Sequence, residues 1–232
     1  MCSEACIEFA RANLREEDVR DKAIIEVGAL DVNGSVRPIV EALGPGSYIG
    51  VDLQKGPGVD LICDSHDLLD RFGYAVFDLL ISTELLEHVR DWRKVITNFK
   101  HILKPNGVLL ITTRSKGFGP HGHPFDFWRY EVEDMETIFS DFSIEVIEKD
   151  PLSPGVFVKA RKPNMFIETR TANYGLFSII TGKRITRTME VSTYYFKGRW
   201  IILRLRMAIR RFLSLILPKP IKRILKERIL GE

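Results

Sequence analysis

The stretch IIEVGALDVNGS, from Ile24 to Ser35, has the form of an apolar strand followed by a tight turn. Glu26 and Gly28 lie at the end of the strand and the start of the turn, as in loops of α/β enzymes that bind phosphates or nucleosides. Such loops usually have a second glycine two positions later, where this chain has Leu30. Because Leu30 cannot adopt a positive φ angle without strain, we expect the turn to follow another path, with Asn33-Gly34 taking the sharp bend.

Outward from this stretch, expected strands alternate with expected helices, which predicts a largely parallel sheet covered on both faces. The expected strands are Ala23 to Gly28, Tyr48 to Asp52, Val59 to Cys63, Val76 to Ser82, Val108 to Thr113, Ser143 to Glu148 and Gly155 to Ala160. The expected helices are Ser35 to Leu43, Trp92 to Leu103, whose apolar residues recur at helical spacing, and Glu131 to Phe139.

A change in charge divides the chain near Arg161. The sequence of 232 residues has a formal net charge of +3, but from Arg161 on it holds 17 Lys and Arg residues and only four acidic ones. We therefore expect an acidic first domain at 1–162 and a basic extension at 163–232. In the extension, apolar residues recur at helical spacing with Arg on both flanks, which predicts basic amphipathic helices broken at Pro218 and Pro220.

The composition also limits the cellular location that we expect. Cys2, Cys6 and Cys63 have the spacing of neither a disulfide framework nor a zinc site. No uninterrupted apolar run reaches the roughly 18 residues that a transmembrane helix needs, and the N-terminus is acidic rather than basic and then apolar. A cytoplasmic protein, peripheral at the inner face of the membrane if its extension binds lipid, is the expectation.

Asp52 ends the second expected strand, where one carboxylate can accept hydrogen bonds from both hydroxyl groups of a ribose. It belongs to an ordered set of segments: EVG, GVD, VDLICDSHDL, FDLLISTELLEHV and LKPNGVLLITT. Together these segments resemble the class I S-adenosylmethionine-dependent methyltransferases, over roughly Ile24 to Lys162. The resemblance implies a Rossmann-like sheet of seven strands, the last of them antiparallel, and S-adenosyl-L-methionine as the cofactor.

The resemblance also assigns cofactor-binding residues to the ends of the strands. Glu26 and Gly28 belong to the first cofactor motif, and Asp52 would hold the ribose. Asp64 would accept a hydrogen bond from the adenine amino group, with the backbone near Ser65 and His66 beside the ring. Thr83 and Glu84 would lie near the methionine end and the methyl group. Asp31 or Asn33 would face the cofactor amine, with capping of the helix from Ser35 as the plainer alternative.

Candidate catalytic residues follow the fourth and fifth strands, where a base would act on the acceptor. They are His88, His121, His123 and Arg129. The alternative for the segment GFGPHGHPFDFWRY is a packed aromatic loop with no catalytic role, and His88 is equally suited to a structural place at a helix start. A metal site at His121 and His123 lacks a third ligand, so we expect no metal.

The absence of two motifs narrows the acceptor. No N-P-P-Y or D-P-P-Y follows the fourth strand, and no Pro-Cys pair is present, which disfavours DNA-base methylation. We therefore expect O- or N-methylation of a small-molecule, saccharide or lipid-linked acceptor. The alternatives are an RNA methyltransferase, a non-catalytic binding module of this fold and, least favoured, a dehydrogenase, which would need glycines at Leu30 and Asn33.

The basic extension allows three partners. Its apolar helix face can dock on the chain itself or form a homodimer, or residues 199–230 can lie on an anionic membrane surface. Nucleic acid is the least favoured partner.

Overall fold

The computed structural model describes residues 2–122, 125–186, 201–202 and 205. The chain divides into two compact units, Met1–Phe118 with Phe125–Met189, and Gly119–Pro124 with Glu190–Glu232. The sheet and the candidate site lie in the first unit. The amphipathic helices expected within 199–230 lie outside the described residues apart from 201–202 and 205, and the domain boundary expected after residue 162 stays a prediction.

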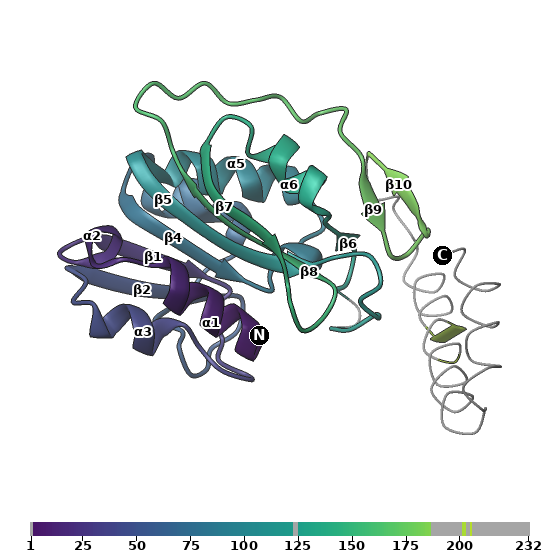
Figure 1. Ribbon diagram of the computed structural model, residues 1–232, viewed down its shortest axis with the longest axis horizontal. Coiled ribbons are helices and arrows are strands. Elements are labelled where there is room, and N and C mark those ends of the chain that lie inside the picture. Colours follow the sequence, from purple (N-terminus) through teal and green to yellow (C-terminus); the bar gives the residue numbers. More distant parts are fainter. Residues whose placement is uncertain (1, 123–124, 187–200, 203–204, 206–232) are drawn as a thin grey trace. The chain divides into compact units, whose positions relative to one another are not determined.

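A seven-stranded sheet forms the centre of the first unit, in the order β3-β2-β1-β4-β5-β8-β7 (Figure 1). Strand β8 runs antiparallel to both of its neighbours, and every other pairing in this sheet is parallel. The expected Rossmann-like, mostly parallel sheet is confirmed. Its strands are β1 (Ala23–Val27), β2 (Ser47–Asp52), β3 (Leu61–Ile62), β4 (Phe77–Thr83), β5 (Leu103–Arg114), β7 (Ser143–Lys149) and β8 (Gly155–Arg161).

Helices cover both faces of this sheet (Figure 1). Helices α1 (Glu4–Asn13) and α3 (Arg37–Ala42) pack with alternate residues of β1, β4 and β5 in one core cluster. The other side carries α5 (Trp92–Ile102) and α6 (Val132–Ile138), with α4 (Leu68–Phe72) against α5. The short elements are α2 (Glu16–Val19), η1 (Ser65–Asp67) and η2 (Leu86–His88). The buried residues of α5 follow the expected stripe, from Trp92 through Val95, Ile96 and Phe99 to Ile102.

Some element boundaries differ from expectation. Strand β3 is shorter than the expected Val59 to Cys63, and α3 begins two residues later than expected. Strand β5 begins at Leu103, because the Lys104 to Gly107 turn is an irregularity at its start rather than a separate connection. Asn106 has a φ of +62° there, and the register with β4 shifts between Phe77 and Leu79.

A second, three-stranded sheet has the order β10-β9-β6, with β6 (Trp128–Arg129), β9 (Leu176–Ser178) and β10 (Lys183–Ile185). The Tyr130 amide, directly after β6, donates a hydrogen bond of 2.9 Å to the Arg114 carbonyl at the end of β5. This bond fixes the small sheet beside the carboxyl end of β5.

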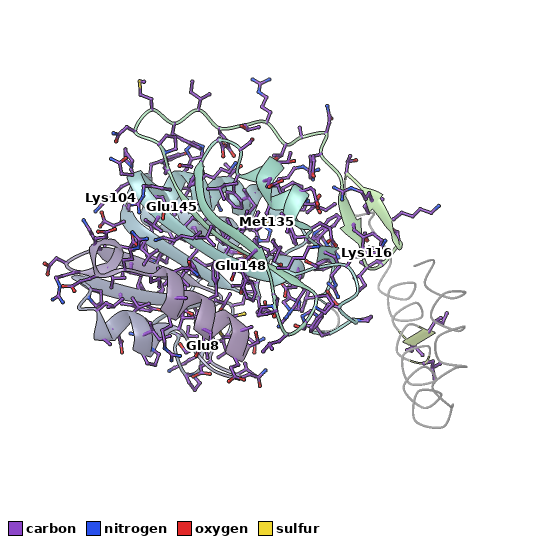
Figure 2. The ribbon with its side chains drawn as sticks, in the orientation of Figure 1. Glu8, Lys104, Lys116, Met135, Glu145 and Glu148 are labelled. Atoms are coloured by element: carbon purple, nitrogen blue, oxygen red, sulfur yellow. The ribbon has the colours of Figure 1, made fainter. Side chains whose placement is uncertain are left out.

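The outer strand β7 carries Glu145 and Glu148, labelled in Figure 2, and such charges discourage further strand pairing at an edge. Within the part of the chain that the structure describes, no helix is long and apolar enough to cross a membrane.

Candidate functional site

The loop after β1 begins at Gly28, which has a φ of +86°. A Cβ atom there would lie 3.2 Å from Leu85 Cβ, so glycine serves both the backbone conformation and the close approach of the segment after β4. The amides of Gly28 and Ala29 donate hydrogen bonds of 2.9 and 3.1 Å to the Val51 carbonyl. These two hydrogen bonds hold the loop after β1, called the first loop below, at the end of β2.

Leu30 packs against the turn at Gly56 and does not take a positive φ angle. A Cβ atom on Gly56 would collide with Leu30 Cδ1, and one on Gly58 would collide with the Ala29 carbonyl. The Asp31 amide donates a 2.9 Å hydrogen bond to the Pro57 carbonyl in the same turn. The first loop thus lies along the Gly56 to Gly58 turn, whose glycines make room for it.

The chain bends at Val32 and Asn33, directly before Gly34, which has a φ of +131°. Of the two residues expected at this bend, only Gly34 has a positive φ. Asp31 Oδ1 accepts a 2.9 Å hydrogen bond from the Gly34 amide and closes this turn. It does not cap the following helix, because α3 begins at Arg37 after an N-cap at Val36 without a side-chain bond.

Glu26 lies near the end of β1 and is 3 % exposed. The Tyr48 hydroxyl of β2 donates a hydrogen bond to its carboxyl group. Burial raises the pKa of Glu26 to about 7, although the bond from Tyr48 opposes the rise. A carboxyl group that titrates near neutral pH at the carboxyl edge of such a sheet is a candidate partner for a cationic ligand group.

Asp52 ends β2 and is partly exposed. Its Oδ2 accepts a hydrogen bond of 3.3 Å from the Leu30 amide, and its Oδ1 accepts one of 3.1 Å from the Gln54 amide. These bonds hold the carboxylate at the sheet edge. Next to it, the Leu53 side chain is 64 % exposed, which leaves an apolar surface beside the carboxylate for a planar ring.

Asp64 starts the short helix η1, and its Oδ1 accepts two hydrogen bonds from His66, 2.9 Å from the amide and 2.7 Å from Nδ1. Burial alone would raise the pKa of Asp64, but the His66 bonds and the charge of Lys94 outweigh it and lower this pKa. Asp64 is therefore an ionised acceptor at neutral pH. Ser65 is buried directly behind it.

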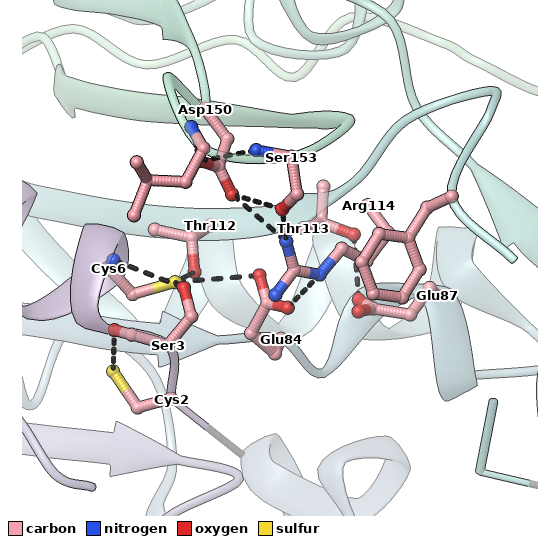
Figure 3. Close-up of polar contacts among 12 residues, drawn as sticks. Cys2, Ser3, Cys6, Glu84, Glu87, Thr112, Thr113, Arg114, Asp150 and Ser153 are labelled. Carbon is pink, nitrogen blue, oxygen red and sulfur yellow. Dashed lines mark hydrogen bonds and ion pairs between the residues drawn. The ribbon is translucent and has the colours of Figure 1, made fainter. Parts of the chain in front are cut away.

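Thr83 and Glu84 lie at the end of β4 and are both almost fully buried. Glu84 has a φ of +55°, a conformation that is strained for a residue other than glycine, and its amide bonds to the Thr112 carbonyl at 2.9 Å. Figure 3 shows its carboxyl group between Cys6 and Arg114. Cys6 Sγ lies 3.6 Å from Glu84 Oε1, and Arg114 Nε forms an ion pair with Oε2.

Arg114 ties this end of β5 to the loop between β7 and β8 (Figure 3). Its Nη1 donates hydrogen bonds of 2.9 Å to Asp150 Oδ2 and 2.7 Å to Ser153 Oγ. Burial raises the pKa of Glu84, and the nearby Glu87 carboxyl group adds to the rise while Arg114 opposes it. Glu84 and Asp150 thus share the Arg114 guanidinium group, and Glu84 lies where the sequence predicts the transferable methyl.

The candidate catalytic residues have distinct surroundings. His88 ends η2, and its Nδ1 donates a hydrogen bond to the Phe125 carbonyl. Arg129 is fully buried, and its guanidinium group donates bonds of 2.6 and 2.9 Å to the two carboxyl oxygens of Asp126. His121 belongs to the second unit, and His123 lies outside the described residues. The catalytic roles of all four stay predictions, and the surroundings of Arg129 favour a structural one.

Four residues of the site were not anticipated from the sequence. Cys6 and Arg114 hold Glu84, Tyr48 bonds to Glu26, and Asn98 bonds to the backbone after Asp64. No motif marks them, because their partners lie 22 to 78 residues away in the chain.

A methyltransferase-domain family model matches residues 5–149, which include every one of these strand ends. The chain belongs to this methyltransferase family. Together with the sheet order, this confirms the expected class I S-adenosylmethionine-dependent methyltransferase. A comparison with curated protein sequences found no match.

Solved structures of methyltransferases share the fold. An S-adenosylmethionine-dependent methyltransferase from Mesorhizobium loti has a TM-score of 0.53 and 19% identity, with 69% of this chain and 99% of that chain covered. The 1,6-didemethyltoxoflavin-N1-methyltransferase of Burkholderia thailandensis, solved with 1,6-didemethyltoxoflavin and S-adenosylhomocysteine, has a TM-score of 0.56 and 18% identity, over 69% and 80% of the two chains. A methyltransferase in complex with the Trm112 activator of Haloferax volcanii has a TM-score of 0.56 and 14% identity, over 69% and 90%.

Proposed function

We propose that this methyltransferase binds S-adenosylmethionine along the ends of β1, β2, β3 and β4 and methylates a hydroxyl or amine group of a small molecule. The observation that carries the proposal is the alignment of acidic side chains along one sheet edge. Glu26, Asp52 and Asp64 come from or directly after three adjacent strands. Their chemistry matches, in order, the ammonium group, the ribose and the adenine amino group of the cofactor.

The methyl group would then lie near Thr83 and Glu84. Methyl transfer requires alignment of the acceptor with the sulfonium and, where the acceptor is protonated, removal of a proton. Burial raises the pKa of the Glu84 carboxyl group there, and the charge of Arg114 opposes the rise. The neighbour from Burkholderia thailandensis is an N-methyltransferase of a small molecule, which supports this class of acceptor.

Isothermal titration calorimetry of the purified full chain with S-adenosylmethionine and S-adenosylhomocysteine tests the proposal. Both should bind, and Asp52→Asn should weaken both, because it replaces a charged acceptor of two ribose hydroxyl groups by a neutral amide. Lack of binding to either ligand would refute the proposal. Acceptors are then screened by mass spectrometry for the gain of one methyl group, starting with amines, saccharides and lipid-linked sugars.

The remaining features stay proposals from the sequence alone. Residues 199–230 would bring the enzyme to an anionic membrane surface or to a second copy of the chain. A cytoplasmic location is proposed on the spacing of the three cysteines, which fits neither a disulfide framework nor a zinc site. Sedimentation with vesicles of anionic and of neutral lipids, with and without residues 199–230, separates these partners. A saccharide or lipid-linked acceptor is favoured if anionic vesicles alone bind the full chain.

A further inference from the structure

Asn98 and Lys100 are the two polar residues among the buried residues of α5, and Asn98 is 4 % exposed. Its side-chain nitrogen donates two hydrogen bonds, each of 2.9 Å, to the carbonyl oxygens of Ser65 and His66. A side-chain amide has two N–H groups on that nitrogen, so both are used on η1. Because both neighbouring groups are carbonyl acceptors, the nitrogen of the Asn98 side-chain amide, and not its oxygen, faces them.

Each of these carbonyls belongs to a peptide group whose N–H holds Asp64. The Ser65 carbonyl shares a planar peptide with the His66 amide, which donates to Asp64 Oδ1 at 2.9 Å. The His66 carbonyl shares one with the Asp67 amide, which donates to the Asp64 carbonyl at 2.9 Å. Because a peptide group is rigid, fixing its carbonyl fixes the direction of its N–H. Asn98 is thus one peptide group away from two of the bonds that hold Asp64, and the His66 ring donates a further bond to the same Oδ1.

Asp64 has an oxygen ready for a ligand. Both bonds from His66 end on Oδ1, and among the described residues no hydrogen bond ends on Oδ2. The Asp64 side chain is 39% exposed, so solvent or a ligand reaches it. An ionised carboxylate oxygen held in one direction accepts a hydrogen bond from an exocyclic amino group and repels a carbonyl at the same place.

We propose that Asn98 is a positioning residue for nucleobase recognition: through η1 it holds Asp64 so that the enzyme selects adenine by its 6-amino group. The proposal rests on the proposed cofactor site. A purely structural Asn98 would support the packing of α5 on η1 and the stability of the fold. It would leave the choice between nucleobases unchanged.

The test compares two ligands that differ at one position of the base. Calorimetry measures the dissociation constants of S-adenosylhomocysteine and of its purine analogue, in which a hydrogen atom replaces the 6-amino group. The unaltered protein should prefer the adenine form by roughly 10-fold or more, the range of a hydrogen bond to a charged group. Asn98→Leu, which has a similar size and no donor, should weaken binding of the adenine form and bring the preference close to unity.

Asn98→Ser is smaller and keeps one donor, so it applies the same test at a lower risk to folding and should give an intermediate preference. Asn13→Leu is the matched control. Its side chain also donates a 2.9 Å bond from a helix to a carbonyl, that of Phe9, but remote from η1. This variant should lower the melting temperature without changing the preference.

A double variant shows whether Asn98 acts through Asp64. Asp64→Ala should abolish the preference, and adding Asn98→Leu to it should change the preference no further. Equal binding of the two ligands by the unaltered protein would overturn the inference, and so would an Asn98→Leu or Asn98→Ser variant that keeps the full preference. Failure of the unaltered protein to bind either ligand would instead refute the proposed cofactor site.

Discussion

Raising the pH from about 5.5 to about 7.5 should strengthen the binding of S-adenosylmethionine while it destabilises the ligand-free protein, with Glu26 as the cause of both effects. Burial raises the pKa of Glu26 to about 7 from an ordinary value of 4.5. Its neutral form is therefore the form present in the folded protein at mildly acid pH. The ammonium group of the cofactor needs the ionised form.

The two magnitudes follow from the same shift. Below about pH 7, each further fall of one pH unit should weaken cofactor binding by up to about tenfold. Binding requires ionised Glu26, and each unit adds about 1.4 kcal/mol to the free energy of deprotonating it. The unfolded chain releases this proton near pH 4.5 and the folded chain near pH 7. The stabilisation of the folded state by protonated Glu26 is therefore complete below about pH 4.5. It is lost as the pH rises to about 7, which lowers the free energy of unfolding by up to about 3 kcal/mol.

Calorimetry with S-adenosylmethionine and urea denaturation of the ligand-free protein, both across this pH range, measure the two slopes. Glu26→Gln keeps the shape and the bond from Tyr48, and it should flatten both profiles. Tyr48→Phe removes a bond that favours the anion, so it should move both inflections to higher pH. Pronounced slopes that persist in Glu26→Gln would refute the assignment to Glu26, and so would flat profiles in the unaltered protein.

Other predictions concern two buried ion pairs and the loop after β1. Asp18→Ala should lower the free energy of unfolding by about 3 kcal/mol in urea denaturation and leave cofactor affinity unchanged, because it removes a buried partner of Lys159 at 2.7 Å. Arg129→Met should cost about 3 to 5 kcal/mol, since it leaves buried Asp126 without this partner; a loss of methyl transfer in the folded variant, measured by product formation, would support the catalytic role instead. Gly56→Ala should weaken cofactor binding in calorimetry, and a Leu30→Ala background should restore it.

The strands were predictable because apolar runs bounded by turn residues are local signals, and β1, β2 and β4 carry them clearly. Helix α1 was not expected. Its buried face consists of Ala5, Cys6, Phe9 and Ala10, so only Phe9 is a large apolar residue, and the periodic signal is weak. Its Cys6 nevertheless reaches Glu84, which places a piece of the site in a segment with no motif.

Single strand-end residues were predictable in the same way, and their partners were not. Asp64 follows a strand and belongs to a motif, but the amide that organises its turn comes from Asn98 on α5, 33 residues from Ser65. Arg114 is marked only as the last residue of a strand, and its pairing with Glu84 depends on the strand neighbours β4 and β5. A motif records which residue types occur near a site, whereas these bonds depend on which elements the fold brings together.

In the loop after β1, residues elsewhere in the fold compensate for a glycine that the usual motif has and this chain lacks. A second glycine at position 30 would leave space between the first loop and its neighbour, but Leu30 fills that space. The chain accommodates Leu30 at Gly56, where any side chain would collide with it, and accommodates the Ala29 carbonyl at Gly58. Gly50 in β2 gives the same room to the Gly58 carbonyl. The glycines that this edge requires are thus distributed over β2 and the turn after it, so a departure from the usual motif in the first loop is compensated by residues that only the folded structure brings beside it.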